Sequence, residues 1–586
     1  MKKLIDELSD ICQKAFTEAG YEAGFGRVNV SSRPDLCEYQ VNGALPCAKK
    51  EHKKPIDIAN EVAEILKGAK AFSKVETCMP GFINLDIDPA FLADYLSEMS
   101  RDENLGIIPD EKKRIIVDYG GANVAKPLHL GHLRSAVIGE AIKRMGTAMG
   151  NEMIGDVHLG DWGLQMGLII EELKDRGQTE FTMSDLEEIY PAASAKSKAT
   201  DENGNPTPAA QAFKERALEA TKKLQAGDPE CTEIWKKVME LSKADLKKNY
   251  DHLDVHFELW KGESDVQKYI PDMLSDFEKR GIAHEDQGAL VVDIREDTDK
   301  KDIPPCIIRK SDGAALYATT DLATILEREK LFAPDDYIYL TDKRQELHFQ
   351  SFFRVARKAG LVRPEQSLTH IGFGTMNGKD GKPFKTRSGG VMRLEMLIKD
   401  IEDAVYEKIR ANRDESEISE VEAREIAETV GLAALKYGDL SNQAAKDYIF
   451  DIDRFTSFEG NTGPYILYTI VRIGSILRSY YAAEGEKPEE TFKPALEASV
   501  DALNLGLSLS RFNEMAASAW KELAPHKICQ FIYEVSNCFN TFYHNCMILK
   551  EEDSELRASY IALLKLTKDV LSKCIWMLGF AAPEKM

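Results

Sequence analysis

Two histidines and a glycine mark the segment with the clearest chemical potential. His129, Gly131 and His132 stand where a short apolar, strand-like segment and a loop give way to a helical pattern. A helix start presents unpaired N–H groups and the positive end of the helix dipole, and both favour phosphate. Glycine allows close approach to the backbone, and imidazole can donate hydrogen bonds to phosphate oxygens as charge develops on them. The segment therefore predicts a nucleotide phosphate site.

The histidines of this segment could instead have a purely structural role. HxGH is a short pattern, and a single histidine near a helix start is more often a packing residue. The strand before the segment, the helix after it and the flanking cations Lys126 and Arg134 favour the phosphate interpretation.

The sequence around these histidines resembles that of a known enzyme family. HLGH is similar to the HIGH motif of class I aminoacyl-tRNA synthetases, and the string ANVAKPLHLGHLRSAVIGEAI resembles the arginyl-tRNA synthetase family of bacterial type. The same resemblance runs through GDVHLGDWGLQMG, SDGAALYATTDLATI, DKRQELHFQSFF and DGKPFKTRSGGVMRLEMLI. It implies a ligase that uses ATP to activate L-arginine as arginyl-adenylate and then transfers the arginyl group to the 3′ end of tRNA-Arg.

The resemblance also implies how such an enzyme works. No covalent enzyme intermediate is needed, and catalysis comes from positioning and from donors aimed at the reacting phosphate, with Mg²⁺ neutralising the polyphosphate. In the family, adenylate formation requires bound tRNA.

One stretch departs from the usual class I pattern. Many class I enzymes carry a KMSKS loop whose second lysine stabilises the pyrophosphate leaving group, but PFKTRSGG stands here, with Ser388 at the lysine position. Family members with this variant have a lysine just before the HIGH motif, which corresponds to Lys126. The resemblance therefore favours Lys126 for the leaving-group role, with Lys385 and Arg387 as helpers. Whether Lys126 or the PFKTRSGG loop carries this role stays open.

A pocket for the guanidinium group of arginine needs carboxylates in bidentate geometry and an apolar or aromatic wall. The resemblance places Tyr317 and Asp321 at the guanidinium, and residues four apart share one face of a helix. It also assigns Asn123, Glu263 and Gln345 to the charged and amino ends of the amino acid. Without the family, Asp321 could be a helix-face carboxylate and Glu263 a capping residue.

The resemblance assigns other residues to ATP. These are Asp161, Gly163 and Gln165 in the segment GDWGLQ, together with His348. Trp162 in the same segment could equally pack in the core.

Both ends of the chain resemble the tRNA-binding parts of the family. FEGNTGPYILYTIVRIGSIL resembles its helical anticodon-binding domain, in which aromatic rings stack on unpaired bases. The resemblance assigns contacts with the anticodon region of the tRNA to Tyr465, Tyr468, Tyr543 and Met586. Near the other end, Gln40 and Asn42 are the candidate polar contacts to the outer corner of the tRNA, although a tyrosine in a helical bundle or an asparagine at a helix start can also be purely structural.

Hydrophobic periodicity predicts three domains. Residues 1–105 read as a small α+β unit, since Leu4, Leu8 and Ile11 follow helical spacing and PGFINLDID alternates like a strand. Residues 106–425 are predicted to form an α/β domain with a parallel sheet, which the segments ALVVDI and DDYIYLTD are expected to join, and with an insertion at about 185–250. The resemblance implies that this domain is the Rossmann-type catalytic domain of the family. Residues 426–586 read as a helical bundle.

Composition restricts the class of protein. The 586 residues are 43% hydrophobic and 30% charged, which is typical of soluble globular chains and excludes collagen-like or largely disordered ones. The net charge of −22 argues against a bulk polyanion binder but allows a local basic channel. The ten cysteines form no CxxC pair, so we expect no protein-bound metal site. An acidic amino-terminal segment and the lack of a long apolar run lead us to expect a cytoplasmic protein without membrane contact, and a monomer.

Three other functions are weighed against this one. A synthetase for glutamate, glutamine or cysteine would share the HIGH motif but not the paired carboxylates. A non-catalytic relative would have lost the donors of the phosphate site, which are present here. A small nucleotidylyltransferase would be much shorter and would lack the helical carboxy-terminal region.

Overall fold

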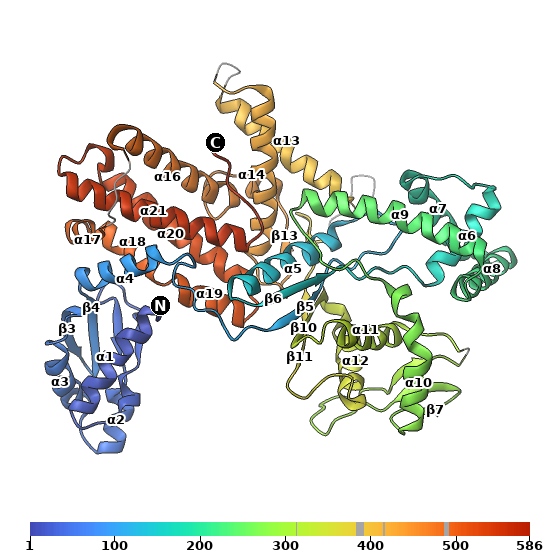
Figure 1. Cartoon of the computed structure of the whole chain (residues 1–586), viewed down its shortest axis with the longest axis horizontal. Helices are drawn as coiled ribbons and strands as arrows, with labels where there is room; N and C mark the ends of the chain where they lie inside the picture. The colour runs from blue at the N-terminus through green and yellow to red at the C-terminus, as the bar shows by residue number, and fades with distance from the viewer. Residues whose placement is uncertain (312, 383–391, 414–416, 486–490) are drawn as a thin grey trace. The chain divides into compact units, whose positions relative to one another are not determined.

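The computed structural model describes residues 1–311, 313–382, 392–413, 417–485 and 491–586. The chain forms two compact units: one comprises residues 111–456, and the other combines residues 1–110 with residues 457–586 (Figure 1). Within the described ranges, no helix is long and apolar enough to cross a membrane.

The unit of residues 111–456 contains a four-stranded parallel sheet. Its strands, in the spatial order β11-β10-β5-β6, are β11 (Ser367–Phe373), β10 (Asp336–Asp342), β5 (Arg114–Asp118) and β6 (Glu152–Asp156). The apolar centres of β5 and β10 are buried, as expected of a parallel sheet covered on both faces. Helix α5 (Leu130–Ala148) connects β5 to β6, and α12 (Glu346–Ala359) connects β10 to β11. The predicted Rossmann-type α/β class is confirmed.

A helical insertion follows β6. It consists of α6 (Leu164–Arg176), α7 (Met183–Ser197), α8 (Pro208–Gln225) and α9 (Pro229–His252). Thr182 and Asp185 form a capping box at the start of α7, while Pro208 and Pro229 occupy the first positions of α8 and α9. These local signals fix where each helix begins.

A small antiparallel sheet lies between the insertion and β10 in the sequence. Its strands are β7 (His284–Asp286), β8 (Ala289–Val292) and β9 (Cys306–Arg309). The expectation that ALVVDI joins the parallel sheet is therefore wrong. Gln287 and Gly288 both have positive φ, and a two-residue turn of this kind closes a β-hairpin, so β8 pairs with β7 instead.

Three further helices of this unit precede β10 in the sequence, η2 (Glu263–Tyr269), α10 (Ile270–Lys279) and α11 (Tyr317–Leu331). After β11 come the short parallel pair β12 (Met376–Asn377) and β13 (Tyr448–Ile449), and the helices α13 (Leu394–Asn412), α14 (Glu420–Leu440) and α15 (Ile452–Phe455).

The other unit begins with an antiparallel sheet in the order β1-β2-β4-β3. Its elements are α1 (Leu4–Glu18), β1 (Val28–Val30), β2 (Tyr39–Val41), α2 (Ala44–Glu51), α3 (Pro55–Leu66), β3 (Phe72–Cys78), β4 (Phe82–Ile87) and α4 (Pro89–Arg101). The helix predicted from Leu4 and the strand predicted at PGFINLDID are both confirmed as α1 and β4.

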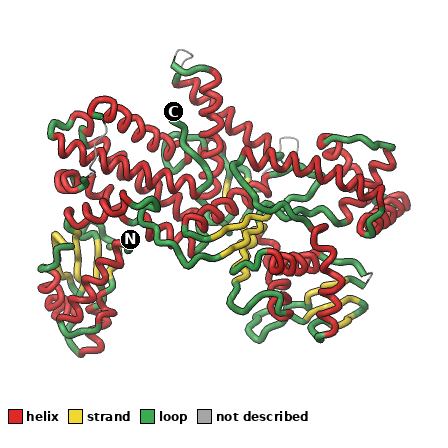
Figure 2. The backbone as a smooth tube through the Cα atoms, in the orientation of Figure 1, coloured by secondary structure: helices red, strands yellow, loops and turns green. Residues whose placement is uncertain are grey.

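Helices make up most of residues 463–577 in the same unit (Figure 2). They are α16 (Gly463–Glu484), α17 (Lys493–Ala498), α18 (Val500–Ser510), α19 (Phe512–Lys521), α20 (Pro525–Asn545) and α21 (Ser554–Met577). The buried side-chain amide of Asn513 donates to the hydroxyl of Tyr95 and to the carbonyl of Gly106, both at 3.1 Å. The α+β amino-terminal part and the helical carboxy-terminal part agree with the predicted fold.

Candidate active site

The two predicted histidines cap helix α5 reciprocally. The backbone N–H of Gly131 donates to Nδ1 of His129 at 3.0 Å, and the backbone N–H of His129 donates to Nδ1 of His132 at 3.1 Å. The two rings lie 3.9 Å apart. Because each Nδ1 accepts a hydrogen bond, the proton of each neutral imidazole is on Nε2. Each ring therefore keeps one N–H donor for a ligand.

Burial lowers the pKa of both imidazoles, and the Lys126 ammonium lowers it further. For His132 the pKa falls to about 3. Both rings are therefore neutral at physiological pH. Gly131 is needed for this arrangement, because a Cβ there would lie 2.9 Å from the ring of His129.

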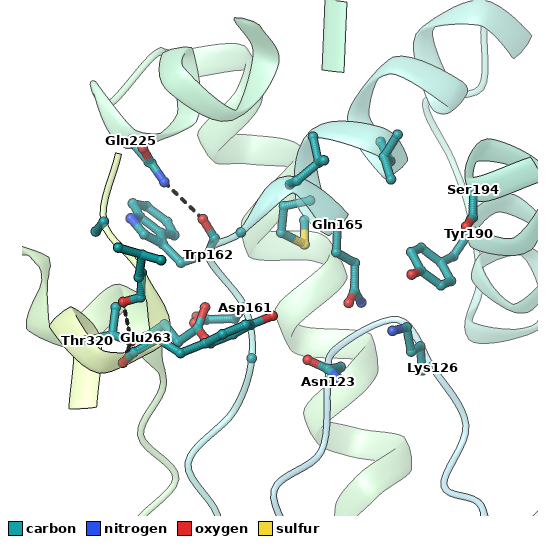
Figure 3. A pocket seen from close by; sticks show the side chains of 18 of the residues that line it. Asn123, Lys126, Asp161, Trp162, Gln165, Tyr190, Ser194, Gln225, Glu263 and Thr320 are labelled. Carbon is teal, nitrogen blue, oxygen red and sulfur yellow. Dashed lines mark hydrogen bonds between the residues drawn. The ribbon is translucent and has the colours of Figure 1, made fainter. Parts of the chain in front are cut away.

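A cavity of about 570 Å³ is lined by Lys126, which lies three residues before His129 in the sequence (Figure 3). The loops after β5 and β6, helices α7 and α8, η2 and the start of α11 contribute its walls, so it lies where ligands bind in open α/β sheets. Seven predicted site residues line it: Asn123, Lys126, Asp161, Gly163, Gln165, Glu263 and Tyr317.

Other predicted residues lie outside the cavity lining. Among the described lining residues there is no His129, Gly131, His132, Asp321, Gln345 or His348. Nε2 of His348, predicted for ATP, lies instead 2.6 Å from a carboxylate oxygen of Asp321. Gln345 is exposed in the short helix η3 (Lys343–Gln345). Lys385, Arg387 and Ser388 lie outside the described residues.

One end of the cavity is acidic. Burial raises the pKa of Glu263 to about 7, and the nearby carboxylates of Asp161 and Asp321 contribute to the rise. Asp161 is buried and accepts hydrogen bonds from the backbone N–H and the hydroxyl of Ser264, at 3.0 and 2.6 Å. Carboxylates that raise one another's pKa favour a cationic ligand.

The other end of the cavity is basic. Lys126 lies there with the amide of Gln165, whose nitrogen donates to the carbonyl of Val124 (Figure 3). Lys198, Lys214 and Lys310 also line the cavity. A cavity with one acidic and one basic end fits a molecule that joins a cationic group to phosphate.

Trp162 lines the cavity and also packs against Trp235. Its ring lies 5.3 Å from that of Trp235, and its carbonyl accepts a hydrogen bond from Gln225 at 3.1 Å. The sequence interpretation missed Tyr190, which lies on α7 with its ring 4.4 Å from the ammonium of Lys126. Tyr190, Ser194 and Ser197 all line the cavity, and their spacing of four and three is the signal that could have identified this helix face.

A buried charge cluster joins the ends of β5 and β6 to α11. Nη2 of Arg328 donates to Asp118 at 2.5 Å and to Asp156 at 2.6 Å. Burial opposes the charged form of His158, but the adjacent carboxylates raise its pKa to about 9. Asp118, Asp156 and His158 are close enough to hold a cation, but the Arg328 guanidinium already pairs with both aspartates. The cluster is therefore an ion-pair network.

Comparison with known proteins identifies the family. Residues 96–452 match the model described as tRNA synthetases class I (R), catalytic domain, and this match spans more than half of the chain. The chain belongs to the arginyl-tRNA synthetase family. Two further domain models match, the arginyl tRNA synthetase N terminal domain at residues 2–87 and the DALR anticodon binding domain at residues 466–586.

Relatives in the arginyl-tRNA synthetase family are similar over their whole length. Proteins named arginine–tRNA ligase from Agathobacter rectalis and Alkaliphilus oremlandii are 55% and 49% identical, with 100% of each chain covered. One from Francisella tularensis subsp. holarctica is 39% identical, with 99% of each chain covered.

Solved arginyl-tRNA synthetases share the fold. The structure from Plasmodium falciparum has a TM-score of 0.80 at 24% identity, and that from Thermus thermophilus has a TM-score of 0.77 at 20% identity. Both comparisons cover 100% of each chain.

The residues predicted to contact tRNA in this family have different environments. The Arg472 guanidinium lies 4.6 Å from the ring of Tyr468 and 5.1 Å from that of Tyr543, and these rings are 40% and 36% exposed. Tyr465 differs from these two residues because its hydroxyl is hydrogen-bonded to Asn537 and Asn540, both at 2.7 Å.

The predicted contacts at the chain ends also differ from one another. Met586, the last residue, is half-buried. The side chain of Gln40 on β2 donates to Asn84 on β4 at 2.9 Å, so it takes part in pairing these strands. The side-chain oxygen of Asn42 is buried.

Proposed function

We propose that this chain is an arginine–tRNA ligase, which activates L-arginine with ATP and transfers the arginyl group to the 3′ end of tRNA-Arg. The observation that carries this conclusion is the 55% identity to a protein of that name over the full length of both chains. The cavity with an acidic and a basic end is consistent with it, because arginyl-adenylate joins a guanidinium to a phosphate.

The acidic end is proposed to hold arginine. Tyr317 begins α11 and Asp321 follows one turn later, so both can face the guanidinium. Glu263, with Asn123 and Gln345, is proposed to hold the amino end and the carboxylate. His348 is proposed to orient Asp321 rather than to bind ATP, because the two side chains are 2.6 Å apart.

The basic end is proposed to hold the phosphates of ATP, which binds as its Mg²⁺ complex. The carboxylate oxygen of arginine attacks the α-phosphorus, the bond to the bridging oxygen breaks and pyrophosphate leaves. The Nε2–H groups of His129 and His132 supply neutral donors, and Lys126 supplies positive charge as the leaving group develops. Asp161, Gly163 and Gln165 are proposed to position the nucleotide, with Lys385 and Arg387 as helpers.

The tRNA is proposed to contact both parts of the unit formed by residues 1–110 and 457–586. Tyr468 and Tyr543 have the exposed rings that stacking on unpaired bases requires, and Tyr465 and Met586 complete this proposed surface. Gln40 and Asn42 are proposed contacts to the outer corner of the tRNA. Domain boundaries near residues 105 and 425, a monomeric state and a cytoplasmic location are part of the proposal, and light scattering of the purified protein tests the monomer.

The experiment that tests the activity is ATP–pyrophosphate exchange with Mg²⁺. Arginine is compared with glutamate, glutamine and cysteine, each with and without bulk bacterial tRNA. We expect exchange with arginine only, and only when tRNA is present. Exchange with another of these amino acids would reassign the substrate, and no exchange under any condition would point to a non-catalytic relative.

A further inference from the structure

Lys126 and Tyr190 meet at the basic end of the cavity. The Lys126 ammonium lies 4.4 Å from the centre of the Tyr190 ring, and both residues line the cavity. Figure 3 shows the end of the Lys126 side chain beside the Tyr190 ring. At this distance the face of an aromatic ring attracts a cation.

The Tyr190 ring attracts the Lys126 ammonium without cancelling its charge. Three lysines of the insertion pair with carboxylates, Lys174 with Glu230, Lys196 with Glu172 and Lys237 with Glu180. Lys126 has no carboxylate partner among the residues that the structure describes. A carboxylate would compete with phosphate for the ammonium, whereas an aromatic face leaves its full charge for an anionic ligand.

The helix that carries Tyr190 is itself tied to the histidine segment. Glu187, three residues earlier on α7, pairs with the Arg393 guanidinium at 2.7 Å. The backbone of Arg393 pairs in turn with that of His129. Helix α7 is thus connected through Arg393 to His129, the N-cap residue of α5, and it presents Tyr190 three residues after Glu187.

Lys126, in contrast, lies on a loop. The residue before it, Ala125, has a φ of 58°, in the left-handed region, and its backbone N–H donates to the Ser242 hydroxyl at 2.9 Å. This contact fixes the backbone of the loop but not the four-carbon side chain of the lysine. The position of the Lys126 ammonium therefore depends on the groups that the ammonium itself contacts.

We infer that Tyr190 is a positioning residue, which holds the Lys126 ammonium at the phosphate end of the cavity. This inference rests on the proposed function, since it needs Lys126 to act on the phosphates. Without the ring, the lysine side chain samples other rotamers, and fewer enzyme molecules present the charge when pyrophosphate departs.

The test is a double-mutant cycle measured by arginine-dependent ATP–pyrophosphate exchange. Tyr190→Leu should lower kcat by about 2- to 30-fold and leave the KM for arginine within about twofold, because a cation–π contact of about 0.5–2 kcal/mol is lost at the phosphate end. Tyr190→Phe keeps the ring and should retain wild-type kcat. In the Lys126→Met background, Tyr190→Leu should change kcat by less than about twofold, since its target is gone.

Tyr269 offers a matched control. Its ring lies 4.6 Å from the Lys330 ammonium, and it does not line the cavity. Tyr269→Leu removes the same kind of contact and should leave kcat unchanged. Should Tyr190→Leu fold poorly, as judged by thermal melting, Tyr190→Met supplies a second non-aromatic side chain that favours helix.

Two outcomes overturn the inference in distinguishable ways. If Tyr190→Leu lowers kcat equally in the wild-type and Lys126→Met backgrounds, Tyr190 does not act through Lys126. If Lys126→Met itself retains wild-type kcat, the proposed role of Lys126 fails along with the inference, although the ligase activity still stands.

Discussion

At the scale of single residues, protonation sets the charge of the acidic end of the cavity. Glu263 has a pKa of about 7, so about half of the molecules carry a neutral Glu263 near neutral pH. A cationic ligand favours the ionised form and lowers this pKa on binding. Binding therefore releases protons at pH values between the lowered pKa of Glu263 in the complex and about 7.

We expect the KM for arginine to fall as the pH rises from 6 to 8. Below the pKa of Glu263, each lower pH unit should raise the KM by up to about tenfold, because more molecules must lose a proton first. Steady-state exchange across this range measures the effect. Glu263→Gln should flatten the profile, while Glu285→Gln, an exposed carboxylate outside the cavity, should not. An unchanged profile in Glu263→Gln would remove this residue from the arginine site.

Asp321 is the residue proposed to select the guanidinium. Asp321→Asn should raise the KM for arginine by about tenfold or more and leave the KM for ATP within about twofold, since a charge-assisted contact is lost only at the acidic end. Both constants are obtained from pyrophosphate exchange. Equal increases in the two constants would contradict the assignment.

At the scale of elements, the Arg328 cluster determines how α11 sits against the ends of β5 and β6. The side chains of Arg328 and Asp156 are only 2% and 1% exposed. Since α11 also carries Tyr317 and Asp321, the ion pairs position the proposed arginine end of the cavity. The same ion pairs therefore contribute both to the stability of the fold and to the position of the cavity residues on α11.

Arg328→Met should destabilise the unit of residues 111–456 by about 3–5 kcal/mol, because it leaves the buried Asp156 and the partly buried Asp118 with less compensating charge. Urea unfolding followed by fluorescence measures the shift. Arg295→Met, which breaks the exposed pair of Arg295 with Asp302 at 3.3 Å, should cost less than about 1 kcal/mol. Similar midpoints for the two variants would show that the buried cluster contributes little.

At the scale of the whole molecule, the proposed sites of substrate activation and tRNA recognition lie in different compact units. The cavity is built by residues 123–320, whereas Tyr468 and Tyr543 belong to the unit that includes residues 457–586. Substitutions in the two units should therefore affect different kinetic constants.

Tyr543→Ala should raise the KM for tRNA by about 5- to 150-fold, since stacking on one base contributes about 1–3 kcal/mol. The KM values for arginine and ATP at saturating tRNA should stay within about twofold. Aminoacylation with varied tRNA measures this split. Met547→Ala, an exposed apolar residue that follows α20, serves as the control. An unchanged tRNA KM in Tyr543→Ala would contradict the proposed anticodon contact.

The sequence by itself determined the family, the fold class and the local elements of this protein. Helix α1, strands β4 and β5, and the capped start of α5 follow from hydrophobic periodicity and from residue types a few positions apart. Tertiary structure alone decided which distant residues meet. Arg328 reaches Asp118 across 210 positions, Lys126 meets Tyr190 of the insertion, and His348 pairs with Asp321 rather than lining the cavity. The physical reason is that periodicity records which face of an element is buried, whereas the partners of a charged side chain depend on the path of the whole chain.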